Sequence, residues 1–162
     1  MNFESNVNEV IARMKERADR ARNPGPALAV AGSIVRDAAF RRFTANDWAP
    51  NSLVTIRRKG SSRPGIDTGT LRNSITSQVE DYAAVIGTNV RYARWFQEGT
   101  GVFAGHQPWR ITRRGKVVSG SGGAMHQGQP ARPFLFIDQT SRDRILAVFK
   151  TYIMTGELVL SA

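Results

Sequence analysis

An aromatic stretch bracketed by glycines, residues 87–101, constrains the fold of this chain more than any other segment. It contains Tyr92, Trp95 and Phe96, and its apolar members recur at helical spacing over residues 90–98. That spacing predicts a short helix. Because glycine is common where helices and strands end, the flanking glycines predict an ordered core before this stretch and a loop after it.

Three longer segments carry apolar residues at spacings of three and four, which is the period of an amphipathic helix. They cover residues 3–22, about 26–43 and about 140–155. Prolines and a glycine within residues 23–26 separate the first two helices, since proline cannot continue a helix. In the first helix the apolar members shrink to alanine toward its end, so we expect shallow packing there. Its stripe consists of Phe3, Val7, Val10, Met14, Ala18 and Ala21.

The centre of the chain alternates apolar and polar residues, which is typical of strands. Residues 75–79 and 82–86 are expected to form two strands joined by a short connection at 80–81. With helices on either side, this pattern predicts an α+β fold: a small, mostly antiparallel sheet packed with N-terminal and C-terminal helices. We expect a single domain over residues 1–162, with a helical N-terminal part over 1–43.

Residues 44–66 lack an apolar period and are expected to be turns and an exposed loop. Trp48 is the exception, since a lone tryptophan between polar turns is most often an anchor against the core. Asp67 or Thr68 is expected to cap a short turn that leads to Leu71.

Residues 102–130 form an extended basic segment with no sustained period. Within it, residues 110–112 and 116–118 are expected to pair as a small ribbon. A segment this long inside a compact domain is usually functional or ordered by a partner. The chain then re-enters the fold through apolar residues 134–137. It ends on an apolar stretch, 158–160, that we expect to join an edge of its own sheet or of a neighbour's.

The chain is strongly basic, with 23 Lys and Arg against 13 Asp and Glu and a formal net charge of +10. Such a balance attracts nucleic acid, acidic membranes or acidic protein surfaces. The windows 57–63 and 99–137 contain no acid. Because both windows are expected to be loops, we expect mobile basic arms rather than one rigid basic face. Both windows lack the interleaved aromatics of a nucleic-acid stacking platform. An acidic protein partner therefore fits them at least as well as nucleic acid.

Composition also limits the compartment and the chemistry. No stretch approaches the roughly 20 apolar residues that a membrane-spanning helix needs, and the N-terminus lacks the apolar run of a secretory signal. Without cysteine, the chain has no disulfide, no thiolate metal site and no thiol nucleophile. We therefore expect a soluble protein made in a reducing cytoplasm, with no membrane partner.

Three motifs that suggest catalysis or ligand binding lack the groups that their chemistry needs. Residues 67–69 read Asp-Thr-Gly, as in aspartic proteases, but that chemistry needs two carboxylates that share a proton, from two copies of the motif or a symmetric dimer. The chain has one copy. The histidines, His106 and His126, fall short of the three or four ligands of a zinc site. The glycine-rich run 119–123 lacks the lysine and the following Ser or Thr of a phosphate loop. No catalytic residue, metal ligand or cofactor is expected, and a protease stays the weakest alternative.

Three short blocks occur in order along the chain, at residues 67–75, 87–99 and 130–135, with Trp48 ahead of them. In this order and spacing they resemble the tailed-bacteriophage virion morphogenesis (tail completion) family and the related head–tail joining neck proteins. The first block carries Thr-Gly, then Leu, then Ser-Ile. The second carries a glycine, Tyr-Ala and Gln-x-Gly, although Phe96 stands where many members have a histidine. The third block is Pro-Ala-Arg-Pro-Phe-Leu.

The resemblance implies a structural protein without enzymatic activity. It would form a ring, commonly a hexamer, at the head–tail junction or the tail end, where it would complete or terminate the tail. The protein would be found in the virion after assembly in the host cytoplasm. Its partners would be copies of itself and the neighbouring neck and tail proteins, with non-specific contact to passing DNA. The alternative that the charge favours is a basic nucleic-acid-binding protein.

Within this reading, we expect the aromatic residues of the 90–98 helix to pack it against the sheet or a neighbouring subunit. Arg132 and Phe134 are expected to lock a returning strand, and the 102–130 loop to reach an adjacent ring. The predicted subunit or partner interface consists of Tyr92, Trp95, Phe96, Gln97, Trp109, Arg110, Arg113, Arg114, Lys116, Arg132 and Phe134.

Overall fold

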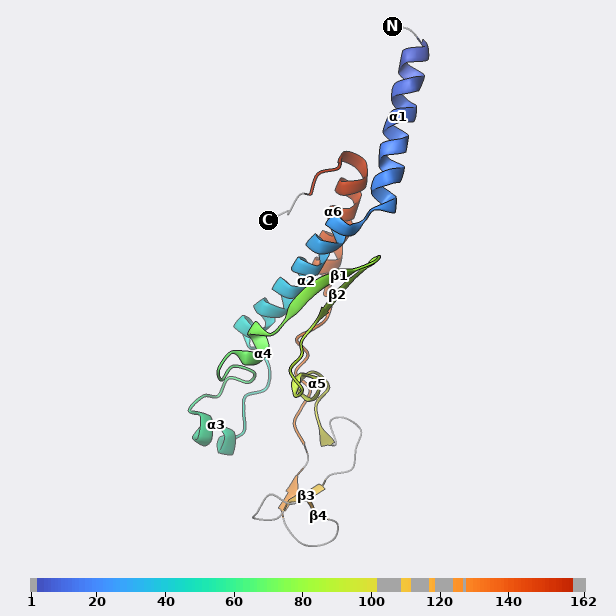
Figure 1. The fold of residues 1–162 in the computed structure, drawn as a ribbon. Helices are drawn as coiled ribbons and strands as arrows, with labels where there is room; N and C mark the ends of the chain where they lie inside the picture. Colours follow the sequence, from blue (N-terminus) through green and yellow to red (C-terminus); the bar gives the residue numbers. More distant parts are fainter. Residues whose placement is uncertain (1–2, 102–108, 112–116, 119–123, 127, 159–162) are drawn as a thin grey trace. The chain divides into compact units, whose positions relative to one another are not determined.

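The computed structural model describes residues 3–101, 109–111, 117–118, 124–126 and 128–158 (Figure 1). It confirms the predicted α+β class. The helices are α1 (Phe3–Arg22), α2 (Gly25–Ala45), α3 (Leu53–Lys59), α4 (Thr70–Asn73), α5 (Ala93–Glu98) and α6 (Gln139–Thr155). The strands are β1 (Thr76–Glu80), β2 (Ala83–Gly87), β3 (Trp109–Ile111), β4 (Val117–Val118) and β5 (Ala124–His126).

The chain divides into two compact units. Residues 1–38, 76–87 and 137–162 form what we call the helical unit, and residues 39–75 and 88–136 form the aromatic unit. The division falls inside α2. The single-domain organisation therefore stays a prediction, and each unit is described by itself.

The core of the helical unit lies between α2 and α6, as the two apolar stripes predict. Ala27 and Ile34 of α2 are buried with Val148 of α6. Other apolar side chains from both helices pack around them: Val30, Ile145, Phe149 and Tyr152. Helix α6 begins where Asp138 accepts a hydrogen bond from the backbone N–H of Ser141 at 2.7 Å, a typical N-cap.

Strands β1 and β2 form an antiparallel hairpin on α2, each shifted by one residue from the predicted range. Ser77 pairs with Ile86, and Val79 with Ala84, so these four side chains share one face. The hairpin lies close to Gly32, because a Cβ at that glycine would be 3.2 Å from the Cβ of Ser77. Glycine thus lets the hairpin approach the helix backbone.

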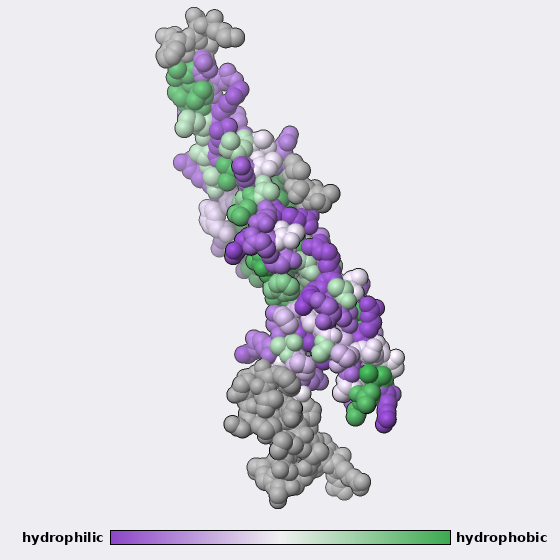
Figure 2. Space-filling view, turned by 180° about the vertical axis from the view of Figure 1, so that it is seen from behind, coloured by the Kyte–Doolittle hydropathy of each residue, from purple (hydrophilic) through white to green (hydrophobic). Residues whose placement is uncertain are grey.

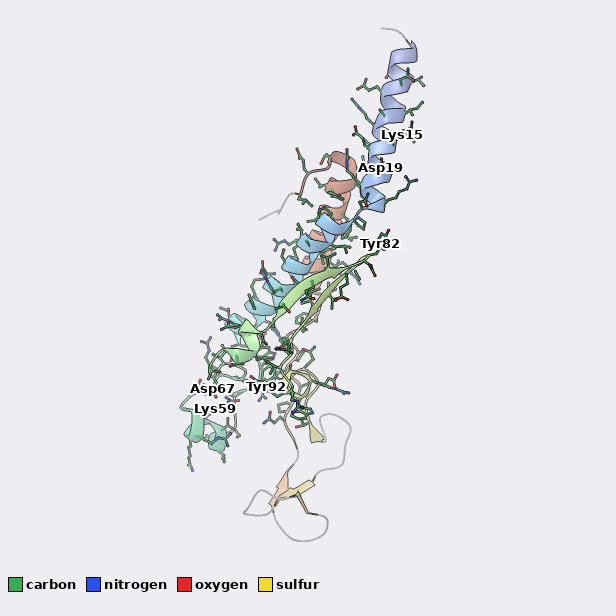
Figure 3. All side chains as sticks on the ribbon, viewed as in Figure 1. Lys15, Asp19, Lys59, Asp67, Tyr82 and Tyr92 are labelled. Atoms are coloured by element: carbon green, nitrogen blue, oxygen red, sulfur yellow. The ribbon has the colours of Figure 1, made fainter. Side chains whose placement is uncertain are left out.

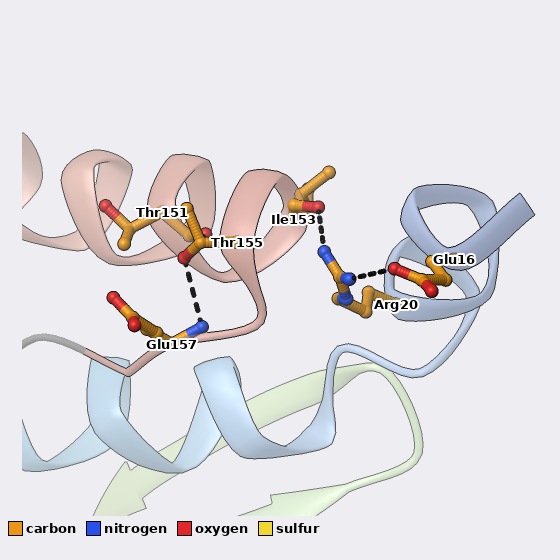
Figure 4. Close-up of polar contacts among 6 residues, drawn as sticks. All are labelled: Glu16, Arg20, Thr151, Ile153, Thr155 and Glu157. Atoms are coloured by element: carbon orange, nitrogen blue, oxygen red, sulfur yellow. Dashed lines mark hydrogen bonds and ion pairs between the residues drawn. The ribbon is translucent and has the colours of Figure 1, made fainter. Parts of the chain in front are cut away.

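Helix α1 forms over the predicted range, but its apolar stripe is exposed. Figure 2 shows apolar side chains gathered along this helix. Its ties to α6 are at its C-terminal end, where Arg20 donates a hydrogen bond to the carbonyl of Ile153 at 3.0 Å and pairs with Glu16 (Figure 4). Shallow packing was expected only near that end, but the apolar stripe is exposed from Val7 onward.

Helix α3 was not predicted, since residues 44–66 were expected to contain only turns and a loop. Ser52 caps α3 by accepting from the N–H of Thr55 at 3.3 Å, and Gly60 ends it in the left-handed conformation. No residue of α3 is buried. A helix specified by its caps carries no apolar stripe, which is the signal that the sequence prediction used.

Helix α4 begins differently from the prediction. Its N-cap residue is Gly69, which has no side chain with which to form a capping hydrogen bond. Asp67 instead pairs with Lys59 at 3.4 Å, and the hydroxyl of Thr68 shares a hydrogen bond with that of Thr70 at 2.6 Å. Gly69 has a φ of +77°, so the turn into α4 rests on the backbone freedom of glycine rather than on a side-chain cap.

A second sheet lies within the predicted long segment. Its order is β4-β3-β5, with Arg110 opposite Val118 and Ile111 opposite Val117, which confirms the expected ribbon. Strand β5 adds to the free edge of β3 and was not predicted. The returning segment 134–137 is not a strand, contrary to the prediction. Residues 159 and 160 of the apolar tail lie outside the described residues.

Candidate partner-binding surface

Four aromatic rings from three parts of the chain form the core of the aromatic unit. Phe43 at the end of α2 is central: its ring centroid lies 5.3 Å from those of Trp48 and Phe134 and 6.1 Å from that of Phe96. Trp48 meets Phe96 edge to face at 5.3 Å. These spacings are those of favourable aromatic pairs. Trp48 is therefore the predicted core anchor, and its indole N–H donates to the carbonyl of Pro133 at 3.2 Å.

The backbone approaches this cluster closely at Gly65. A Cβ there would lie 2.7 Å from a ring carbon of Phe96 and 2.9 Å from one of Phe43. Gly65 also has a φ of +71°, a conformation that other residues adopt at a cost. That the aromatic residues of the 90–98 helix pack it against the sheet or a neighbouring subunit stays a prediction. The contacts of the Phe96 ring within its own unit are described here. The ring packs against the end of α2 and the loop at Gly65, because both present aromatic or backbone surface to it.

Gln97 of α5 holds the returning segment through three hydrogen bonds. Its Oε1 accepts from the backbone N–H groups of Phe134 and Leu135 at 2.9 and 3.1 Å, and its Nε2 donates to the carbonyl of Leu135 at 2.9 Å. In addition, the backbone N–H of Arg132 donates a hydrogen bond to the backbone carbonyl of Phe96 at 2.8 Å. A side-chain amide thus satisfies backbone groups that a strand partner would otherwise satisfy.

The other two aromatic residues of segment 87–101, Tyr92 and Trp95, face solvent. Tyr92 is 45% exposed and Trp95 is 60% exposed. Both lie at α5, whose first residue, Ala93, is buried. The helix is thus attached to its own unit through Ala93, Phe96 and Gln97. Its other side presents aromatic surface, which is enriched in binding interfaces.

Arg132 is buried, with only 6% of its surface exposed. Its Nη2 lies 3.5 Å from the carbonyl oxygen of Ala49, and its guanidinium carbon lies 5.8 Å from the centroid of the Phe96 ring. Its Nε has no hydrogen-bond partner among the described residues. Burial lowers the pKa of this guanidinium, because a desolvated cation is destabilised. Arginine nevertheless keeps its charge at neutral pH.

Arg132 lines a pocket of about 370 Å³ in the aromatic unit. Three cations and one carboxylate contribute to its wall: Arg58, Lys59, Arg132 and Asp67. Lys59 and Asp67 lie beside each other and form an ion pair (Figure 3). Tyr92, Phe96 and Leu71 supply apolar wall, and threonine hydroxyls supply polar atoms.

The structure brings part of the predicted interface together. Phe96, Gln97, Arg132 and Phe134 meet in the aromatic unit, where they stabilise its own fold. Trp109 and Arg110 lie on β3. Arg113, Arg114 and Lys116 lie outside the described residues. Whether these positions contact a partner stays a prediction.

Sequence reasoning missed Phe43, Gly65 and Arg58 as parts of this surface. Phe43 was expected only as the last residue of the second helix, and Arg58 to lie in a mobile basic arm. Their meeting depends on how distant segments pack, for which a single sequence carries no local signal. Within the residues that the structure describes, no three histidine or carboxylate side chains are grouped as a metal site needs. The same residues include no helix long and apolar enough to cross a membrane.

The chain was compared with known proteins and families. The model of the phage virion morphogenesis family matches residues 3–154. No protein with a curated description and no solved structure matches the chain. The matched range runs from the start of α1 into the last turn of α6 and covers parts of both units. The chain therefore belongs to the phage virion morphogenesis family.

Proposed function

We propose that this chain is a structural subunit that assembles with copies of itself into a hexameric ring at the head–tail junction or the tail end. There it completes or terminates the tail and offers a docking surface to neighbouring neck and tail proteins. The family supports the coarser statement, a role in assembly of the phage virion, and points to a structural protein. The ring and its position are the proposal.

The observation that carries self-assembly is the uncovered apolar stripe of α1. Val7, Val10, Ile11 and Met14 lie at helical spacing and are 41%, 51%, 43% and 64% exposed. Exposed apolar patches of this kind mark interaction sites on soluble proteins. Burial of such surface contributes about 25 cal/mol per Å² of apolar area removed from water. The stripe is therefore a strong candidate for association.

A second copy of this chain is the occupant that we assign to the stripe. A neighbouring copy presents the same stripe and further exposed apolar residues, such as Leu53 and Val54 at the start of α3. A contact between different surfaces of identical subunits repeats from copy to copy, and it closes into a ring when the rotation permits. The stripe and the ring proposal therefore fit each other.

Substitution of Met14 by glutamate tests this assignment, with Ala12→Glu as its matched control. At about 100° per residue, Ala12 lies on the opposite face of the helix from the stripe. Both substitutions place the same charged side chain on an exposed helix. We expect Met14→Glu to shift the protein to monomers in sedimentation velocity and Ala12→Glu to keep the wild-type oligomer. Equal oligomers for Met14→Glu and the wild type would contradict the assignment.

We further propose that the 102–130 segment contacts the adjacent ring, because it is basic and contains no acid. Deletion of residues 104–128, most of which lie outside the described residues, should leave α2 and α6 folded and block head–tail joining. Infectious particles formed with the deleted protein would contradict this role.

The net charge of +10 favours one alternative, a nucleic-acid-binding protein. It predicts duplex DNA binding whose affinity falls steeply with salt. Charge reversal at Arg113, Arg114 and Lys116 should then weaken DNA binding. Unchanged DNA affinity after that reversal would count against the alternative and leave the structural role.

A further inference from the structure

We propose that the pocket of the aromatic unit binds the carboxylate of an acidic side chain, Asp or Glu, from another protein of the virion. Arg132 forms the floor of this site and Arg58 its rim. That the partner is a virion protein rests on the proposed assembly role, whereas the chemistry of the pocket does not.

The first argument is the buried charge of Arg132. A buried guanidinium is costly unless it is paired and hydrogen-bonded. Here its Nε has no hydrogen-bond partner among the described residues, and its bond to the Ala49 carbonyl is long, at 3.5 Å. The ring of Phe96 contributes a cation–π contact. None of these contacts is with an anion, and a carboxylate in the pocket that Arg132 lines would supply one.

The second argument is the balance of charge in the pocket wall. Lys59 is already paired with Asp67, at 3.4 Å. Within the described part of the chain, neither Arg58 nor Arg132 forms an ion pair. Two uncompensated guanidinium groups therefore border the same pocket of about 370 Å³. Planar guanidinium groups match the geometry of a carboxylate particularly well.

The shape and the wall of the pocket favour a protein side chain over a nucleic acid. Arg132 is almost wholly buried, whereas the phosphates of a duplex lie on the surface of a wide, rigid cylinder. Leu71 and Phe96 give apolar wall that suits the methylene groups of Asp or Glu.

A different protein fits better than a second copy as the source of the carboxylate. Copies of this chain carry a net charge of +10 each, so their basic pockets repel one another at long range. An acidic segment of another protein is attracted by the same field.

The test is an NMR titration of the full-length protein with acetyl-Gly-Glu-Gly-amide, with acetyl-Gly-Gln-Gly-amide as the uncharged control peptide. We expect the Glu peptide to shift backbone resonances around the pocket and the Gln peptide to leave them unchanged. Arg132→Gln should weaken binding about tenfold, because hydrogen bonds to charged groups are the strong ones. Equal binding of both peptides would overturn the proposal.

Because Arg132→Gln can also unfold the aromatic unit, the exposed Arg58 supplies a second variant. Arg58→Gln should weaken binding about threefold, the effect of an exposed ion pair. Arg91→Gln makes the same change of net charge outside the pocket and should weaken binding less. Equal losses in these two variants would show general charge attraction and overturn the proposal.

Asp67→Asn supplies a change in the opposite direction. It frees Lys59 and removes a repelling carboxylate, so the Glu peptide should bind about threefold more tightly. Asp143→Asn on α6 makes the same change of net charge elsewhere and should have a smaller effect. Unchanged binding in Asp67→Asn would contradict the pocket site.

Two measurements distinguish this proposal from nucleic-acid binding and from the proposed ring. Binding of a duplex oligonucleotide should respond equally to Arg58→Gln and Arg91→Gln, and dependence of DNA rather than peptide binding on Arg58 would overturn the carboxylate assignment. The oligomeric state is measured in the same samples. A monomeric protein that binds the Glu peptide would contradict the ring and support the pocket, whereas a ring that does not bind it would do the reverse.

Discussion

The side-chain amide of Gln97 pairs with the backbone of Leu135 in both directions: it donates to the carbonyl at 2.9 Å and accepts from the N–H at 3.1 Å. This arrangement reproduces the bonding of a strand neighbour with a single side chain. It attaches α5 to the segment that carries Arg132 and Phe134. The floor of the proposed carboxylate site is thus positioned by Gln97 together with the aromatic cluster.

Gln97→Ala should lower the free energy of unfolding by about 2 kcal/mol, because it leaves half-buried backbone donors without a partner. Urea unfolding followed by circular dichroism measures this. Gln78→Ala, at an exposed position of β1, is the control and should change stability by less than about 0.5 kcal/mol. Equal stability of the two variants would contradict the role of Gln97.

Phe43→Ala should be strongly destabilising, by about 3–5 kcal/mol, because it removes the central ring of the aromatic cluster and leaves a cavity. The same urea experiment applies. Tyr82→Ala removes a comparable ring from an exposed position of the hairpin turn and should cost less than about 0.5 kcal/mol. A small loss for Phe43→Ala would mean that the cluster does not hold the aromatic unit together.

Gly65→Ala and Gly60→Ala form a matched pair, since both glycines have a φ of +71°. Around Gly60 a new Cβ meets open space, so its substitution should cost about 1 kcal/mol for the left-handed backbone alone. At Gly65 the Cβ would overlap Phe96 and Phe43, which should add about 1–3 kcal/mol. Thermal or urea unfolding compares them. Equal losses would show that the close approach at Gly65 is relaxed without cost.

Ser141→Ala should stabilise the protein, by about 1 kcal/mol. Ser141 is fully buried near the start of α6, and its hydroxyl has no hydrogen-bond partner among the described residues. Removal of an unsatisfied buried hydroxyl is favourable, and alanine is a better helix former. Ser33→Ala in α2 is the control, because that hydroxyl donates to the carbonyl of Val30 at 2.7 Å. A loss of stability in Ser141→Ala, relative to the control, would contradict this account.

The long helices and the hairpin could be predicted from sequence because their patterns are local. Helices α1, α2 and α6 repeat apolar residues over many turns, and the β1–β2 pair alternates. Trp48 could be placed in the core because a lone tryptophan between polar turns is most often an anchor against it. Helix α3 could not, since its caps specify it without any apolar stripe.

The contacts of the candidate site could not be predicted because they join residues far apart in the chain. Gln97 and Leu135 are 38 positions apart, and Phe43 meets the rings of Phe96 and Phe134, which lie far along the chain. The stripe of α1 shows a further limit. Periodicity marks a helix face that becomes covered, and the same pattern arises whether the chain itself or another copy covers it.

Electron microscopy of the purified, full-length protein tests the central claim most directly. The account predicts closed rings, with six-fold symmetry in averaged end-on views, and their loss in Met14→Glu but not in Ala12→Glu. A folded protein that shows only monomers, at concentrations where soluble ring proteins assemble, would contradict it.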